Sequence, residues 1–296
     1  MRALAVPAPD AVSPDRLRRR VDARLAELLP RPADHRDLVC MAMRESTLAP
    51  GKRTRPLLMI IAARELGCCS QSVVDAGCAV EMVHAASLTL DDMPCMDDAE
   101  LRRGRPTIHR RFGEDIAILA SVALLSQAFQ LVASLPGVAP AVRNRLVAEL
   151  ACAVGPQGLV GGQCRDLRDG SGMRDVDDIV DTNALKTGAL FAAALEMAAL
   201  LAEAGDDDRR HLRAAACELG QAFQLYDDLQ DRRDSSCTGK DCDKDAGKST
   251  LLSVLGAEEV RRRLHAHIDG AQAAFARVYG DDSALAGYCG RLFGVA

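Results

Sequence analysis

The sequence contains no tryptophan and few aromatic residues of any kind. Aromatic residues make up 3% of the 296 residues, whereas hydrophobic residues as a whole make up 48%. A core must therefore be built from Ala, Leu, Val, Ile and Met, a set that favours helices packed on helices over a β-rich fold. The sequence has neither the sustained alternation of half-buried strands nor a glycine-rich turn between a strand and a helix. We therefore do not expect a dinucleotide-binding fold.

The chain also lacks an excess of positive charge, and residues 1–9 do not have the basic start followed by an apolar stretch that is typical of a secretory signal. Its formal net charge is -5, which argues against broad nucleic-acid binding because that requires a basic face. The 11 cysteines form no CxxC pair, so we interpret them as reduced, buried side chains in a cytoplasmic protein. The apolar run Ile116–Ser134 is interrupted by Gln127 and Gln130. We expect it to be a central helix buried on all sides, with no stable membrane insertion.

Almost every long segment has apolar residues at helical spacing. Ser13-Pro14 is a helix start signal, since a hydroxyl cap precedes a proline at the first helical position. The expected helices cover about residues 14–29, 34–47, 54–66, 71–93, 113–134, 139–160, 176–185, 187–204, 207–231 and 251–278. No linker divides the chain, so we expect one large all-α helical bundle over residues 1–296, with residues 1–12 flexible.

Four carboxylates fall within the segment LDDMPCMDD, residues 90–98, at the end of an apolar helix. Carboxylate oxygens are hard ligands that suit Mg²⁺; the alternative is an acidic helix end exposed to water. On a straight helix Asp97 would point away from Asp91. Pro94 removes a helical hydrogen bond, so we expect the chain to break there and to return Asp97 to the same metal site.

A second acidic segment, FQLYDDLQD at residues 223–231, again ends a largely apolar helix. Asp227 and Asp231 are four residues apart, so their carboxylates face the same way. Mg²⁺ usually takes one or two protein carboxylates and completes its shell with water and ligand phosphates. Two acidic helix ends therefore indicate a phosphate-bearing substrate and not a closed structural metal cage.

Cations are interleaved with the two acidic segments. They occur in GKRTRP at residues 51–56, in LRRGRP at 101–106, in KTG at 186–188, where we expect a helix break, and at Lys240 and Lys248. Each alone is typical of a solvated surface, but their order together indicates a diphosphate site. His84 lies seven residues before Asp91, on the same helix face. A lone histidine there is usually a core group; here we interpret it as a ligand.

These motifs, with GLVGGQ before Asp166, resemble the trans-isoprenyl diphosphate synthases, most closely the bacterial geranylgeranyl diphosphate synthases of carotenoid biosynthesis. The resemblance runs from about Gly51 to Gly256. It implies the isoprenoid synthase fold, a helical bundle around a central cavity, and a homodimer. It also implies condensation of isopentenyl diphosphate with allylic diphosphates, with three Mg²⁺ per active site. Charge drawn onto the leaving diphosphate weakens the allylic C–O bond, isopentenyl diphosphate attacks the carbocation, and a proton leaves, to the departing diphosphate.

The resemblance also assigns roles to individual residues. It places Mg²⁺ on Asp91, Asp97, Asp227 and Asp231, with Asp92, Asp228 and Lys186 taking part in catalysis. It places isopentenyl diphosphate on Lys52, Arg55, His84 and Arg103, and the allylic diphosphate on Arg102, Lys186, Thr187, Gln224 and Lys240, with Lys248 as a further diphosphate-facing lysine.

Small residues precede the first acidic segment. Ala86 and Ser87 lie five and four residues before Asp91, where farnesyl-producing members of the family place an aromatic side chain that closes the cavity. We therefore expect growth past C15, to geranylgeranyl diphosphate (C20), unless Ala86 only packs against a neighbouring helix. Candidate floor residues are Met82, Val83, Leu124, Leu125 and Phe129. The alternatives are a farnesyl diphosphate synthase, a non-catalytic regulatory subunit of a heteromeric synthase, and a class I terpene cyclase.

Overall fold

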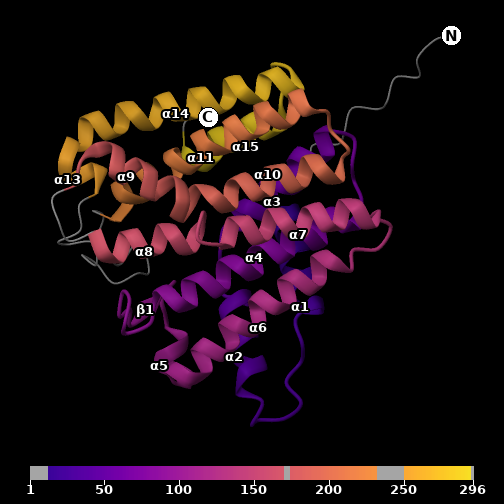
Figure 1. The fold of residues 1–296 in the computed structure, drawn as a ribbon, viewed down its shortest axis with the longest axis vertical. Helices are drawn as coiled ribbons and strands as arrows, with labels where there is room; N and C mark the ends of the chain where they lie inside the picture. The colour runs from indigo at the N-terminus through magenta and orange to yellow at the C-terminus, as the bar shows by residue number, and fades with distance from the viewer. Residues whose placement is uncertain (1–12, 170–173, 232–249, 295–296) are drawn as a thin grey trace.

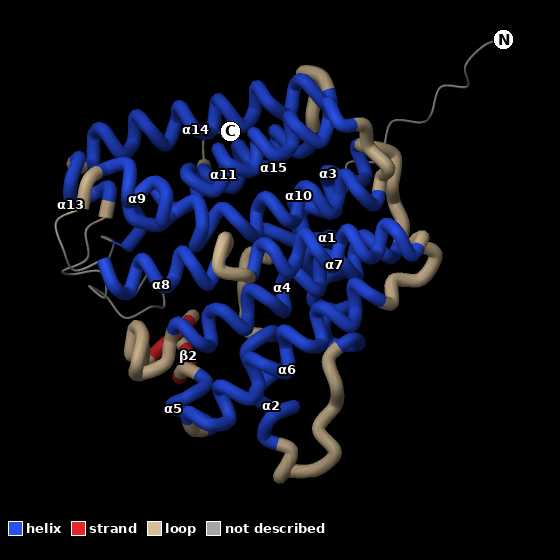
Figure 2. Tube along the Cα trace, viewed as in Figure 1, coloured by secondary structure: helices blue, strands red, loops and turns tan. Residues whose placement is uncertain are grey.

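The computed structural model describes residues 13–169, 174–231 and 250–294, and in these residues helices predominate (Figures 1 and 2). The helices are α1 Pro14–Leu28, α2 Leu38–Leu48, α3 Thr54–Glu65, α4 Gln71–Asp91, α5 Ile108–Phe112, α6 Glu114–Ala133, α7 Pro140–Val154, α8 Leu159–Asp169, α9 Val176–Asn183, the π-helical turn η1 Ala184–Gly188, α10 Ala189–Leu201, α11 Asp206–Asp231, α13 Leu251–Leu255, α14 Ala257–Tyr279 and α15 Ala284–Phe293. Two short strands, β1 Leu101–Arg102 and β2 Arg105–Pro106, pair antiparallel in register Leu101 to Pro106 and Arg102 to Arg105. Residues 1–12, which we expected to be flexible, lie outside the described residues.

Helix α10 lies at the centre of the bundle and packs against α3, α4, α7 and α11. Outside this group α6 covers α4, and α14 covers α11 (Figure 1). Among the described residues, the buried hydrophobic side chains form one cluster that runs from Leu17 in α1 to Phe293 in α15. The predicted all-α bundle is therefore confirmed. Ala, Leu and Val at helical spacing form its interior, since only burial against other helices removes so many apolar faces from water.

Two predicted helices are each divided in two. The segment predicted as 139–160 is broken between α7 and α8, because Pro156 cannot donate the hydrogen bond that would continue the helix. The segment predicted as 251–278 is broken at Gly256, which has φ +79° and separates α13 from α14. The short helix α5, the C-terminal helix α15 and the β1–β2 hairpin were not predicted.

The prediction that residues 116–134 are buried on all sides is wrong. One side of α6 packs on α4 through fully buried residues such as Ala117 and Leu124. The other side exposes Ile118, Leu119 and Val122 by 47%, 53% and 58%. By length and composition alone, α4, α6 and the continuous segment Val176–Leu201 could each cross a membrane, but only 39% of the most apolar window of α6 is buried. Helix α6 is therefore a surface helix with an apolar outer face.

The helix break predicted at Lys186 is also wrong, because α9 continues into α10 through the π-helical turn η1. Two glycines let neighbouring helices approach this turn. A β-carbon at Gly162 in α8 would lie 2.3 Å from the backbone nitrogen of Lys186, and one at Gly220 in α11 would lie 2.7 Å from the Gly188 Cα. A wide turn that lets side chains leave the regular helical positions is a common feature of functional sites, and η1 carries Lys186 and Thr187.

Candidate active site

The first acidic segment begins where α4 ends. The predicted break at Pro94 is confirmed: the chain turns there, and the Asp97 N–H donates to the Asp91 carbonyl at 2.9 Å. Asp98 takes the left-handed conformation, with φ +45°. The backbone therefore brings Asp97 back beside Asp91, as a straight helix would not.

Asp91 carries an unfavourable charge in the described protein. Burial raises the pKa of its carboxyl to about 6; the neighbouring Asp97 and Asp92 raise it further, and Lys186 and Arg102 oppose the rise. A bound cation would reverse this effect, since it favours the ionised carboxylate. Asp91 and Asp97 together are hard oxygen donors of the kind that Mg²⁺ prefers.

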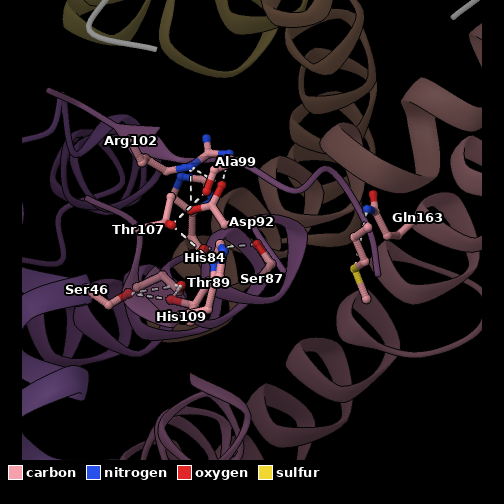
Figure 3. Close-up of polar contacts among 12 residues, drawn as sticks. Ser46, His84, Ser87, Thr89, Asp92, Ala99, Arg102, Thr107, His109 and Gln163 are labelled. Carbon is pink, nitrogen blue, oxygen red and sulfur yellow. Dashed lines mark hydrogen bonds and ion pairs between the residues drawn. The ribbon is translucent and has the colours of Figure 1, made fainter. Parts of the chain in front are cut away.

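The Asp92 carboxylate faces the Arg102 guanidinium (Figure 3). The Arg102 Nε donates to both carboxylate oxygens at 2.8 and 2.9 Å, and Nη2 donates to Oδ1 at 2.5 Å. Asp92 is 3% exposed. The nearby Thr107 hydroxyl donates to the Ala99 carbonyl at 2.7 Å. Asp92 therefore fastens the β1–β2 hairpin to the end of α4 and holds Arg102 beside the first acidic segment.

The second acidic segment is connected to η1 through side-chain hydrogen bonds. The Thr187 hydroxyl donates to Gln224 Oε1 at 3.0 Å, and Gln224 Nε2 donates to Asp228 Oδ1 at 2.8 Å. Lys186 Nζ lies 2.6 Å from Asp166 Oδ2 in α8. Asp166 was assigned no role from the sequence, although it follows GGQ by three residues. The structure thus joins α8, η1 and α11 around Lys186.

The Arg55 side chain is buried. It is 7% exposed, and its Nε has no hydrogen-bond partner among the described residues. Its Cζ lies 4.6 Å from the ring centre of Phe191 and 5.9 Å from that of Phe223. Burial lowers its pKa to about 10, although Glu81 and Asp227 favour the charge. A buried cation without a hydrogen-bonded partner at Nε is the arrangement expected where an anionic ligand binds.

The other predicted isopentenyl diphosphate ligands lie near Arg55. Lys52 Nζ lies 5.2 Å from the ring centre of Tyr226, next to Asp227. The Arg103 guanidinium packs on Gly51, where a β-carbon would lie 2.8 Å from Nη1. Burial, then Arg55 and Arg103, lower the pKa of His84 well below its usual range. His84 is therefore neutral at neutral pH.

A partly open cavity lies beside α4, between α2 and the β1–β2 hairpin. It is bordered by His84, Arg103, Asp92 and Arg102, and by Arg53 and Glu81. Three of the predicted substrate-binding residues thus share one opening. The Ser87 hydroxyl donates to the His84 carbonyl at 2.9 Å (Figure 3).

The predicted chain-length residues differ in exposure. Ala86 is fully buried, whereas Ser87 is partly exposed on the face of α4 that carries His84 and Asp91. The candidate floor residues Met82, Val83 and Leu124 are buried, and Leu125 and Phe129 are partly buried against the core.

Within the described residues no group of three His, Cys, Asp or Glu side chains forms a ready metal site. The negative charge of Asp227, in α11, favours the protonated form of the Arg55 guanidinium. The Asp231 side chain, Lys240 and Lys248 lie outside the described side chains.

The fold and the site together define a class of protein: an all-α bundle in which two acidic helix ends each have cations nearby, Lys186 and Arg102 at Asp91 and Arg55 at Asp227. The chain belongs to the polyprenyl synthetase family, whose sequence profile it matches over residues 37–279. This is a family of prenyltransferases.

Individual relatives support this assignment. The chain is 53% identical over 250 residues to a geranylgeranyl diphosphate synthase of Pantoea ananas, covering 84% of this chain and 82% of that one. It is 53% identical over 266 residues to a geranylgeranyl diphosphate synthase of Pseudescherichia vulneris, covering 88% and 86%. The fold matches the apo crystal structure of a FPP/GFPP synthase from Zymomonas mobilis with a TM-score of 0.85, at 35% identity and over 95% and 97% of the two chains.

Proposed function

We propose that this protein is a Mg²⁺-dependent trans-prenyltransferase that condenses isopentenyl diphosphate with allylic diphosphates to form geranylgeranyl diphosphate. The observation that carries the proposal is the grouping of buried, incompletely paired Arg55 with Asp227, and of Lys186 with Asp91. It is supported by 53% identity to two enzymes that bear this name. Residues 1–296 act as one polyprenyl synthase domain in this proposal.

The acidic segments hold the metal ions in this account. Asp91 and Asp97 on one side, and Asp227 and Asp231 on the other, offer carboxylate oxygens to Mg²⁺. When bound, three Mg²⁺ stabilise the charge that develops on the leaving diphosphate. Asp92 and Asp228 act through neighbouring side chains. Asp92 orients Arg102. Asp228 accepts a hydrogen bond from the Gln224 amide, which in turn accepts one from the Thr187 hydroxyl.

The cations divide the two diphosphates between them. Lys52, Arg55, His84 and Arg103 hold isopentenyl diphosphate; Arg102, Lys186, Thr187, Gln224 and Lys240 hold the allylic diphosphate, with Lys248 beside them. Phe191 and Phe223 pack around the Arg55 guanidinium and keep water from it. Exclusion of water protects an allylic carbocation from hydrolysis and strengthens each charge interaction in the site.

Product length follows from the small residues of α4. In this account the small side chains of Ala86 and Ser87, five and four residues before Asp91, leave room for the growing tail to pass. An aromatic side chain at either position would stop growth at C15. A farnesyl diphosphate synthase is the second candidate, because FPP appears in the name of the similar Zymomonas mobilis enzyme.

The exposed apolar face of α6 is where a second copy of the chain binds in this account. Ile118, Leu119 and Val122 lie on one side of a helix whose opposite side is core. Exposed apolar patches of this kind mark interaction surfaces, and a two-fold dimer would cover the face with its own counterpart. The homodimer acts in the cytoplasm and supplies isoprenoid biosynthesis, including carotenoid biosynthesis.

The test is whether the purified protein alone consumes labelled isopentenyl diphosphate when given an allylic diphosphate and Mg²⁺. Consumption that stops with EDTA supports the proposal. Release of diphosphate from the allylic substrate without use of isopentenyl diphosphate would indicate a terpene cyclase. No turnover without a second, different subunit would indicate a regulatory subunit.

A further inference from the structure

Arg53 lies in the sequence between two predicted diphosphate ligands, Lys52 and Arg55, but its own guanidinium binds protein acceptors. It is 4% exposed. Its Nε donates to Asp22 Oδ1 at 2.7 Å, Nη1 to Glu81 Oε1 at 2.8 Å and Nη2 to the Ala49 carbonyl at 2.8 Å. Each nitrogen of the guanidinium thus has a protein acceptor, and these bonds join α1, the end of α2 and α4 to the start of α3.

The backbone at Arg53 is left-handed, with φ +51°. Such a conformation is unfavourable for a residue with a β-carbon, and it persists only where surrounding contacts impose it. Arg53 is the residue immediately before α3. Its conformation therefore decides the directions in which Lys52, before it, and Arg55, in the first turn of α3, project.

Glu81 is the inner partner of Arg53. It is 3% exposed and lies three residues before His84 in α4. Its charge also acts on Arg55 and Arg103, favouring the protonated form of each. Glu81, Arg53, His84 and Arg103 border the same cavity. The buried Glu81 carboxylate thus lies among three arginines, Arg53, Arg55 and Arg103. The group therefore has a net positive charge that favours binding of an anion.

We propose that Arg53 and Glu81, anchored by Asp22, are positioning residues for the isopentenyl diphosphate half of the site. Arg53 fixes the turn that aims Lys52 and Arg55, and Glu81 keeps the arginines together against their mutual repulsion. The inference rests on the proposed function, in which Lys52, Arg55 and Arg103 receive isopentenyl diphosphate. It adds two buried residues that touch no substrate.

The test compares Arg53→Gln with a matched control, Arg24→Gln. Arg24 also joins α1 to α4, through bonds of 2.8 and 3.0 Å to the buried carboxylate of Asp75, away from the cavity. We expect Arg53→Gln to raise the KM for isopentenyl diphosphate about tenfold or more, with kcat and the KM for the allylic diphosphate within about twofold. Arg24→Gln should lower the melting temperature and leave the KM for isopentenyl diphosphate unchanged.

A conservative variant separates position from charge. Arg53→Lys keeps the positive charge, but an ammonium on a flexible stem cannot hold Asp22, Glu81 and the Ala49 carbonyl in the fixed fork of a guanidinium. We expect its KM for isopentenyl diphosphate to stay at least about threefold above that of the wild type. Full recovery of the KM in Arg53→Lys, or an unchanged KM in Arg53→Gln, would overturn the proposal.

Asp22→Asn keeps the proposal testable if Arg53→Gln does not fold. The Asp22 side chain is 44% exposed, so its loss weakens only the outer anchor, and we expect a two- to threefold rise in the same KM. The Kd of isopentenyl diphosphate, measured by calorimetry, gives a readout without turnover. A wild type that binds but makes no product would refute the proposed function alone, whereas equal Kd values for wild type, Arg53→Gln and Asp22→Asn would refute the positioning role.

Discussion

Replacing Arg55 by methionine should make the unliganded protein more stable and the enzyme less active. A guanidinium pKa of about 10 in place of about 12.5 corresponds to about 3 kcal/mol of disfavoured charge. Because burial lowers this pKa, the cost is present at every pH below about 10. Methionine removes the charge and fills the space, while the ring contacts with Phe191 and Phe223, worth about 1–2 kcal/mol, are lost.

The net gain of about 1–2 kcal/mol should raise the melting temperature of the ligand-free protein by about 2–3 °C. Loss of charge-assisted hydrogen bonds to the diphosphate, about 1.5–3 kcal/mol, should raise the KM for isopentenyl diphosphate about 10- to 150-fold. Thermal melts without ligand and steady-state kinetics at saturating allylic diphosphate measure the two effects.

Arg24→Met is the control, since Arg24 is paired with Asp75 and Glu27. Its replacement should lower the melting temperature and leave the KM unchanged. A lower melting temperature for Arg55→Met together with a normal KM would refute the reasoning, because Arg55 would then be a structural cation.

Three further predictions concern product length, the metal and assembly. Ala86→Phe should shorten the product to C15 and, because Ala86 is fully buried, should lower the stability of the fold by about 1–3 kcal/mol. Ser87→Phe should also shorten the product, with a smaller loss of stability. Product alcohols that stay at C20 in both variants would refute this account of the cavity. Burial raises the pKa of Asp91 to about 6, so its ionisation destabilises the metal-free fold as the pH rises from about 4 through about 6. Because Mg²⁺ competes with that proton, the rise in melting temperature on adding Mg²⁺ should be larger at about pH 7 than at about pH 5, and smaller in Asp91→Asn. An equal rise at both pH values would contradict this prediction. Ile118→Glu should give a monomer in light scattering, whereas Val254→Glu, exposed to a similar extent on α13, should stay dimeric; a dimer in both would place the interface elsewhere.

The residues that could be predicted from the sequence are those whose position follows from local rules. The return of Asp97 to Asp91 follows from Pro94, and the backbone bond of 2.9 Å between them agrees. Gly256 could have been interpreted in the same way, since a glycine within an apolar run commonly ends a helix. The predicted break at Lys186 was wrong because tight packing against Gly162 and Gly220 accompanies a π-helical turn there, and packing of this kind has no local signal.

The residues missed from the sequence act through partners distant in the chain. Arg53 pairs with Asp22 and Glu81, and Lys186 pairs with Asp166; no periodicity in the sequence indicates which acidic side chain pairs with which cation. The apolar outer face of α6 was predicted to be interior for a related reason. Composition shows that a side chain avoids water, but not whether its own chain or another copy covers it.

Product analysis of the wild-type protein tests the central claim most directly. The purified protein would be incubated with Mg²⁺, labelled isopentenyl diphosphate and C5, C10 or C15 allylic diphosphates, and the products resolved by length after dephosphorylation. The account predicts a dominant C20 alcohol that is absent when EDTA is added. No prenyl alcohol from any of the three starters would contradict it.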